Sequence, residues 1–431
     1  MYNYQLSLNN AYQKQAKLFE QSDGSSLHRA SDNPINYSKY MRYNVSETEN
    51  TQYIDNIDSA SSWMKNSDDV LVHVSNIMQT MKEKSVDAAN SHNAEDDYAA
   101  IYKEMFGNMQ EMVSSLNTQV NDRYLFAGQK DLTKPFTLSQ EQYDRGLAKT
   151  LDVAQSVFFK GTTGDYNTSL YQMLELNKDG ETFYLDTESG NVFTKDFVDN
   201  GYNEIAALGY ENLEEAQAST DSKVTILLKE GLADTLTDFS VADYFTSQGL
   251  LKDESVTSVD GYSFTTIKQN IVTYNGDENL ISMVKLNGAT DPAADTVNST
   301  GARMFGTDIF DNEASGNEAS GTAMLNQLLC VTEKVNSCDT KWMSSDGVTI
   351  ADVAHSTLVV EETRIGARQQ MYATAHTLLT NQADNITEDL TNVSGTDIAA
   401  LATKLTELTT LYNLSLSMGG RILPQSLADY L

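Results

Sequence analysis

The sequence predicts a mainly α-helical protein that carries an inserted, mostly β middle domain. Both ends contain long stretches with apolar residues at alternating three- and four-residue spacing, and no proline lies between Pro34 and Pro135. The segment between the ends instead contains short β-prone runs separated by turn residues. We expect the N- and C-terminal helices to pair into a coiled-coil or bundle rod from which the middle domain projects, because neither end can bury its apolar stripe alone. The alternative is a separate bundle at each end.

The N-terminal region predicts two long helices joined by a short connection. A seven-residue apolar repeat begins at Ile57 and stops before residues 90–97, whose sequence NSHNAEDD supplies helix-capping residues. A short connection favours an antiparallel hairpin. Methionines are frequent on both helices, and ordinary core packing explains them better than an adaptable surface for two different neighbours. The stripes comprise Ile57, Ala60, Met64, Ser67, Leu71, Val74, Met78, Met81 and Ala88 on the first helix, and Tyr102, Met105, Met109, Met112 and Leu116 on the second.

The middle region is strongly acidic. Residues 136–320 contain 31 Asp and Glu against 11 Lys and Arg, so they supply −20 of the net charge of −32. Turn residues flanked by β-prone runs predict hairpins at 181–194 and 270–288, and residues 223–231 are expected to form a strand. The excess negative charge favours solubility and discourages pairing between exposed strand edges.

The C-terminal region returns to helix. Helices are expected at 323–335 and from Thr349 to about Asn392, with Gly395 ending the second and Thr396-Asp397 capping the next. Gly419-Gly420 and Pro424 should end that last helix. Its apolar stripe comprises Ile398, Leu401, Leu405, Leu408 and Tyr412, flanked by Leu411, Leu414 and Leu416.

Two further side-chain predictions concern this region. Cys330 and Cys338 should share a helix, where eight residues rise about 12 Å, too far for a disulfide. Arg364 and Arg368 share one helical face with Glu361 and Glu362 just ahead, and we expect solvated pairing within the helix, although bridges to acidic groups of a neighbour are the alternative.

These features divide the chain into three parts. Residues 1–45 with 394–431 are expected to form a terminal coiled-coil assembly domain, 46–136 with 320–393 a helical rod domain, and 137–319 the acidic inserted domain. The first 45 residues carry only a sparse apolar stripe, whereas the last helix is apolar on more than one face. The last helix is either buried by the first alone, or both are completed only when subunits stack.

Composition excludes several classes of function. A net charge of −32 argues against a nucleic-acid surface and against docking on anionic lipid. The HExxH, GxGxxG, GxxxxGK[ST] and GxSxG motifs are absent, and the five histidines are not spaced for a shared metal. We therefore expect no catalytic, cofactor-binding or metal-binding residues. No stretch of 18 apolar residues and no cleavable secretory signal is visible.

Several motifs resemble the flagellin and hook-associated protein superfamily. SSLHRASDNPINYSKYMR (25–42) resembles its N-terminal loop signature, and NDRYLFAGQKDLTKPF (121–136) is similar to the segment that closes the N-terminal helices of the hook-associated protein 3 family. TRIGARQQMY (363–372), the YNGD stretch that opens 274–306 and the ending SLADYL (426–431) resemble C-terminal features of the same group. The resemblance covers about 1–136 and 270–431, and residues 137–269 match no known pattern.

This resemblance implies a structural, non-enzymatic role in the bacterial flagellum, at the junction between hook and filament. It implies export through the flagellar type III apparatus without a cleavable signal peptide, and an extracellular location. The implied partners are further copies in a ring or helical layer, hook-associated protein 1, flagellin and an export chaperone, with no nucleic acid, membrane or cofactor. The candidate assembly residues are Leu8, Leu18, Ser31, Asp32, Asn33, Pro34, Leu401, Leu405, Leu408 and Tyr412.

Two other functions remain open. The chain could be flagellin itself or a minor filament protein, although Asp32-Asn33-Pro34 departs from the usual flagellin loop. Alternatively, residues 137–269 could carry an independent activity on an assembly frame, such as a glycan-binding or hydrolytic module.

Overall fold

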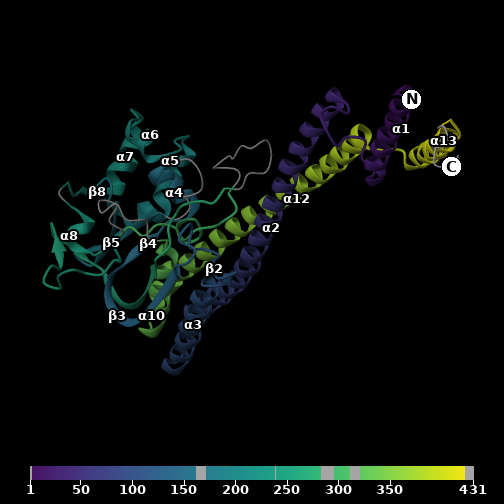
Figure 1. Ribbon diagram of the computed structural model, residues 1–431. Helices are drawn as coiled ribbons and strands as arrows, with labels where there is room; N and C mark the ends of the chain where they lie inside the picture. The colour runs from purple at the N-terminus through teal and green to yellow at the C-terminus, as the bar shows by residue number, and fades with distance from the viewer. Residues whose placement is uncertain (1, 162–170, 238, 283–295, 311–320, 423–431) are drawn as a thin grey trace. The chain divides into compact units, whose positions relative to one another are not determined.

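The computed structural model describes residues 2–161, 171–237, 239–282, 296–310 and 321–422 (Figure 1). The chain divides into two compact units, residues 1–58 with 374–431 and residues 59–373. Each is described separately below. The fold class is confirmed: long helices at both ends flank a β-rich middle region.

In the first unit the two ends of the chain pair laterally. Helix α1 (Tyr2–Glu20) packs along α13 (Ile398–Ile422), with the rings of Tyr12 and Tyr412 6.4 Å apart. Gln15 Nε2 donates to Thr409 Oγ1 at 3.1 Å, so the pair is antiparallel. The unit also contains the start of α2 (Pro34–Ala88) and the end of α12 (Val348–Ser394), which the amide of Asn50 links by donating to the Leu379 carbonyl at 3.0 Å.

In the second unit the predicted apolar seam of α2 is buried. Helix α3 (Glu95–Leu116) turns back along α2, as the ion pairs Lys84–Glu104 (3.0 Å) and His73–Glu111 (3.1 Å) show. The antiparallel hairpin is therefore confirmed. The six methionines Met64, Met78, Met81, Met105, Met109 and Met112 are all almost fully buried, which confirms that they are core residues.

Helices from the C-terminal region complete this core. Helix α10 (Ala323–Asn336) packs on α3, and Gln369 Nε2 of α12 donates to the Met64 carbonyl of α2 at 3.2 Å. The helices predicted at 323–335 and 349–392 are confirmed. Cys330 is buried in α10, but Cys338 lies beyond the helix end with φ +54°, so the expectation that both share one helix is wrong.

A two-stranded ribbon leads into and out of the middle domain. Strand β3 (Phe136–Gly146) pairs antiparallel with β11 (Thr266–Tyr274), and a register shift lies between Gln269 and Ile271. A smaller pair, β1 (Gln119–Val120) with β2 (Arg123–Tyr124), precedes it. The ribbon brings the two boundaries of the insert together.

The middle domain is built on a seven-stranded antiparallel sheet. Its order is β8-β7-β6-β5-β10-β9, and β4 also pairs with β5. The strands are β4 (Ala148–Thr150), β5 (Gln172–Lys178), β6 (Glu181–Leu185), β7 (Asn191–Thr194), β8 (Leu232–Thr235), β9 (Ser258–Val259) and β10 (Tyr262–Phe264). The predicted hairpin at 181–194 is confirmed as β6–β7, with Leu185 opposite Val192.

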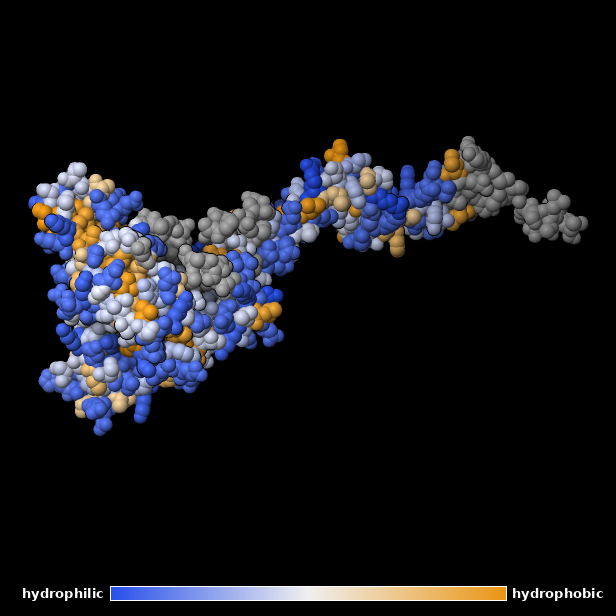
Figure 2. All heavy atoms as spheres, turned by 90° about the vertical axis from the view of Figure 1, so that its left-hand side faces the viewer, coloured by the Kyte–Doolittle hydropathy of each residue, from blue (hydrophilic) through white to orange (hydrophobic). Residues whose placement is uncertain are grey.

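Short helices pack against this sheet and make the domain less purely β than expected. An aromatic core that includes Phe158, Phe159, Phe193, Phe197 and Tyr202 joins them to the strands. The helices are α4 (Val153–Lys160), η3 (Phe197–Gly201), α5 (Tyr202–Ala207), α6 (Leu213–Gln217), α7 (Ser222–Gly231) and α8 (Val241–Tyr244). Farther along the chain lie α9 (Gly301–Phe305), α11 (Thr340–Trp342) and η5 (Met343–Gly347). Figure 2 shows hydrophilic residues covering most of one face, with apolar residues in small groups.

Two strand predictions fail. Residues 223–231 form helix α7 because the Asp221 side chain caps the helix by accepting from the Lys223 N–H, and apolar residues at Val224, Leu227 and Leu228 share one helical face. The hairpin expected at 270–288 is wrong, because β11 pairs with β3, which lies earlier in the sequence, and not with the residues that follow β11. Residues 283–288 lie outside the described part of the chain.

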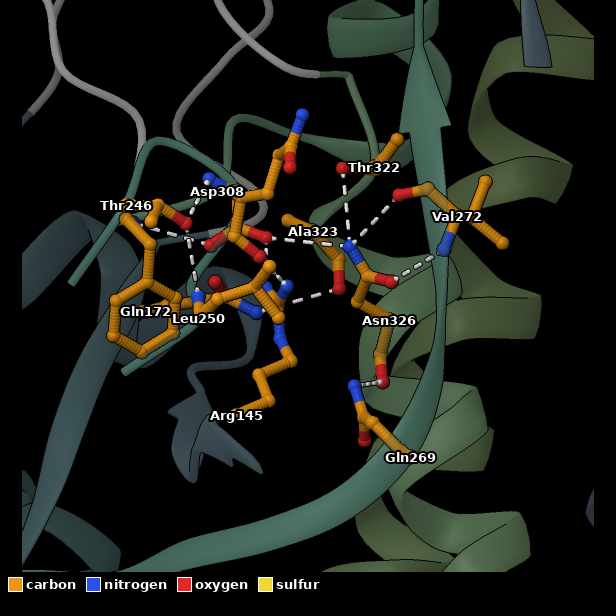
Figure 3. A network of polar contacts seen from close by, with 12 residues as sticks. Arg145, Gln172, Thr246, Leu250, Gln269, Val272, Asp308, Thr322, Ala323 and Asn326 are labelled. Carbon is orange, nitrogen blue, oxygen red and sulfur yellow. Dashed lines mark hydrogen bonds and ion pairs between the residues drawn. The ribbon is translucent and has the colours of Figure 1, made fainter. Parts of the chain in front are cut away.

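A buried polar network holds the ribbon against α10 (Figure 3). Arg145 of β3 forms an ion pair with Asp308, and both side chains are 1% exposed. Asn326 of α10 accepts from the Val272 N–H at 3.0 Å and donates to its carbonyl at 3.2 Å, and it also donates to Asp308 at 3.4 Å. Buried polar groups are costly unless they are hydrogen-bonded, so this network fixes where the ribbon meets the helix.

Within the described residues, no helix is long and apolar enough to cross a membrane. The same residues contain no group of three or more His, Cys, Asp or Glu side chains placed to hold a metal ion.

Removing Arg145 should strongly destabilise the protein. Arg145→Met leaves the Asp308 carboxylate buried without its cation, which is expected to cost about 3–5 kcal/mol in urea unfolding. Arg145→Met with Asp308→Asn should recover part of that loss. The control is Arg123→Met, which removes an arginine whose side chain is 60% exposed from its pair with Asp131 and should cost less than about 1 kcal/mol. Equal costs for Arg145→Met and Arg123→Met would contradict the assignment.

Candidate assembly surfaces

The connection between α1 and α2 is joined to the connection between α12 and α13. The Ser26 N–H donates to the Ser394 carbonyl at 2.6 Å, and the Thr396 N–H donates to the Gly24 carbonyl at 3.0 Å. Asp397 caps α13 by accepting from the N–H groups of Ala399 and Ala400. The two connections are thereby held as a short antiparallel bridge.

Asp32, one of the predicted site residues, organises the loop 21–33. Its carboxylate accepts from the N–H groups of His28 and Arg29 at 3.2 and 3.0 Å and forms an ion pair with Lys17 of α1 at 2.9 Å. The hydrogen bond from Lys17, followed by that from the Arg29 backbone, lowers the pKa of Asp32 to about 2. The loop is therefore ordered by contacts within one chain.

The rest of the loop signature has a local role too. Asn33 Oδ1 accepts from the Asn36 N–H at 3.1 Å, so Asn33 caps α2, and Pro34 is the first helical residue. Arg29 pairs with Glu20 at 3.0 Å, and His28 with Asp23 at 2.8 Å. The backbone of Ser25 and then the His28 side chain lower the pKa of Asp23. Ser31 is exposed.

The predicted stripe residues of the terminal helices face each other within the chain. Leu401 is buried, and Leu18, Leu405, Leu408 and Tyr412 are half-buried. Leu8 lies in α1, but its side chain is outside the described ones. The stripe residues whose side chains are described are therefore at least partly covered within one chain, in which α1 packs on α13.

A second set of apolar residues on the same helices remains exposed. Leu411 and Leu414 of α13 are 50% and 57% exposed, and Phe19 of α1 is 65% exposed. The set also includes Leu6, Tyr12, Ile398 and Leu416. We call these seven residues the terminal apolar set. Several large apolar side chains left exposed on one helix pair make that pair a candidate interaction surface. The sequence already indicates this surface, since the last helix is apolar on more than one face. None of the seven residues is among the predicted assembly residues, however.

Two motifs quoted for the resemblance pack against one another in the second unit. The Tyr274 hydroxyl donates to the Phe126 carbonyl at 2.8 Å, and Asp277 accepts from the Gln129 N–H at 2.7 Å. A Cβ at Gly128 would lie 2.1 Å from Asp277 Oδ1, so only glycine fits there. The RYLFAG and YNGD motifs thus close the helical part where the insert leaves and returns.

The sequence predicts a solvated face for the arginines of the RIGAR motif. The structure contradicts this prediction, because both side chains are largely covered. Arg364 pairs with Glu361 and donates to Ser299 Oγ at 3.2 Å, and its side chain is only 10% exposed. Arg368 is buried and donates to the carbonyl and hydroxyl of Thr296. Both arginines hold the segment 296–300 on α12.

Models of protein families match both helical ends of the chain. Residues 2–131 match the bacterial flagellin N-terminal helical region, and residues 348–431 match the bacterial flagellin C-terminal helical region. Both helical ends of the chain are thus similar to the helical regions of bacterial flagellin. The resemblance inferred from the loop and RYLFAG motifs is therefore confirmed. Residues 132–347 lie outside both matches.

Two curated relatives bear the name flagellar hook-associated protein 3. The Escherichia coli protein is 29% identical over 150 residues, which cover 34% of this chain and 47% of its own length. The Salmonella typhimurium protein is 29% identical over 170 residues, covering 38% and 53%. The chain thus spans about half the length of the curated relatives it matches.

Solved structures show a looser likeness. A flagellar hook-associated protein from Vibrio parahaemolyticus aligns with a TM-score of 0.45 and 12% identity over 84% of this chain and all of that one. Hook-associated protein 3 from Legionella pneumophila aligns with a TM-score of 0.38 and 14% identity over 82% and 98%.

Removing the Asp32 carboxylate should loosen the loop 21–33. Asp32→Asn loses the pair with Lys17, so trypsin should cleave after Arg29 several-fold faster. Because the pKa of Asp32 is lowered in the folded chain, its contribution is complete above about pH 4 and is lost as the pH falls toward 2. Acid unfolding of the first unit should accordingly begin at higher pH in Asp32→Asn.

The control for this experiment is Glu47→Gln, which changes an exposed carboxylate on α2 outside the loop. Its cleavage rate after Arg29 should equal that of the unmodified chain. Equal rates for Asp32→Asn and the control would show that Asp32 does not order the loop.

Proposed function

We propose that this chain is a structural subunit of the bacterial flagellum that forms the junction between hook and filament and provides the surface on which flagellin assembles. The observation that carries this proposal is the terminal apolar set, exposed on a helix pair that both flagellin-type regions build. The curated relatives named hook-associated protein 3 favour the junction position over other flagellar positions.

The proposed role is non-enzymatic and extracellular. The expected partners are further copies of the chain, hook-associated protein 1, flagellin and an export chaperone, and export would occur without a cleavable signal peptide. We assign assembly to residues 1–45 with 394–431 and a supporting rod to 46–136 with 320–393. The acidic domain 137–319 would face outward, where its charge opposes aggregation.

Two alternatives predict different distributions of the chain. Flagellin or a minor filament protein would occur along the whole filament. A binding module within 137–269 would bind a ligand in addition, and the chain would keep the same position in the flagellum.

Immunogold labelling of isolated flagella with antibody against the middle domain tests the position. The proposal predicts a single narrow band where hook meets filament. Label along the whole filament would contradict the proposal and favour a filament protein instead.

A charge placed in the terminal apolar set should block assembly without unfolding the free chain. Leu411 is 50% exposed, so Leu411→Asp should leave the circular dichroism and thermal midpoint of the free chain unchanged. In an assembled layer the carboxylate would be buried, which is costly, so incorporation into flagella should fall at least about tenfold. Thr410→Asp, one residue away and also exposed, is the matched control. Normal incorporation of Leu411→Asp would remove Leu411 from the interface.

A further inference from the structure

A buried group of charges joins the middle sheet to the helical part of the second unit. Lys149 of β4 is 7% exposed, and its Nζ lies 2.8 Å from Asp199 Oδ1 and 3.2 Å from Asp346 Oδ1. Lys195 reaches the other oxygen of Asp346 at 2.7 Å. Two lysines are thus matched by two aspartates.

Both aspartates are carried by π-helical turns. Asp199 lies in η3, which follows the sheet strand β7, and Asp346 lies in η5, which leads directly into α12. π turns are rare and are frequent at functional positions. Here they bring carboxylates from the middle domain and from the helical part to one lysine.

Glu175 adds a third carboxylate to this balanced group. It lies on β5 and is 8% exposed, and it lines a small cavity together with Lys149, Trp342 and Asp346. An ionised Glu175 would leave the cluster with one excess buried negative charge. Lys334, which also faces it, is paired with Asp339 at 2.9 Å. The titratable groups around Glu175 are Lys149 on β4, Tyr184 on β6, Lys195 after β7, Cys330 and Lys334 on α10, and Asp346 on η5.

We propose that these charges form a pH-sensitive latch between the middle sheet and the helical part, tight while Glu175 holds a proton and weakened when Glu175 ionises. The latch consists of Lys149, Glu175, Lys195, Asp199 and Asp346. Its two sides are the middle domain, which supplies Lys149 and Glu175 from the sheet and Lys195 and Asp199 from the segment after β7, and η5 at the start of α12, which supplies Asp346.

The direction of the pH effect follows from burial. Burial, and after it the charge of Asp346, raises the pKa of Glu175 from 4.5 to about 7. The folded chain therefore holds this proton more tightly than the unfolded chain does. The stability linked to Glu175 is complete below about pH 4.5 and is lost as the pH rises through 7.

Trp342 provides a direct reporter of the latch, because it lines the same cavity and its ring lies 5.4 Å from the Lys334 ammonium. The chain has two tryptophans, so Trp63→Phe leaves Trp342 as the sole indole. In the full chain with Trp63→Phe, fluorescence from pH 5 to 9 should show a transition with a midpoint near 7. Hydrogen exchange of β4, β5 and η5 should speed up across the same transition.

Three variants on this background decide the assignment. Glu175→Gln should abolish both transitions, and Glu188→Gln, whose side chain is 76% exposed, should leave them unchanged. Lys195→Gln removes a half-exposed cation and should move the midpoint to higher pH, which keeps the test valid if Glu175→Gln does not fold. A transition that persists in Glu175→Gln, or a midpoint that Lys195→Gln does not move, would overturn the proposal. A fluorescence change without faster exchange would show that Glu175 titrates but does not latch the domain.

Discussion

The apolar seam of α2 is the constraint on which the rest of the fold depends. A helix of 55 residues with methionine, leucine and alanine along one face has no means of burying that face by itself. Helix α3 covers part of it by turning back, but further cover comes from α12, where Gln369 contacts Met64 across 305 residues of sequence. Everything between α3 and α10 is consequently an insert whose two boundaries must lie together. The β3–β11 ribbon and the contacts between RYLFAG and YNGD satisfy that requirement.

The distribution of charge follows from the same arrangement. The chain has only 29 basic residues, and several are buried in specific pairs, such as Arg145 with Asp308, Lys149 with two aspartates, and Arg368 with Thr296. These cations fix junctions between segments that are far apart in the sequence. The surface is left with a large excess of carboxylates, which suits a domain that should remain free of neighbours while the terminal helices make contacts.

Features with local causes could be predicted from the sequence. Periodicity identified the long helices, Asn33 with Pro34 and Asp397 marked two helix starts, and Ser189-Gly190 marked the β6–β7 turn. Features with distant partners could not be predicted in this way. The solvated position expected for Arg364 was wrong because its hydrogen-bond partner, Ser299, is 65 residues away in the sequence. The strand expected at 223–231 is an exception, because its failure has a local cause: the Asp221 side chain caps a helix there. For the candidate site, the stripe Leu401, Leu405 and Leu408 follows from spacing alone, whereas spacing does not show which apolar residues a partner helix leaves exposed.

The central claim is that the terminal helices pair within one chain and that their exposed apolar residues contact neighbours only after assembly. Hydrogen exchange of the free chain and of the same chain within isolated flagella measures this directly. We predict that exchange in α1 and α13 slows by orders of magnitude on assembly, while strands β4 to β10 exchange equally in both states. Unchanged exchange in α1 and α13, together with protection of the sheet, would contradict it and move the interface to the middle domain.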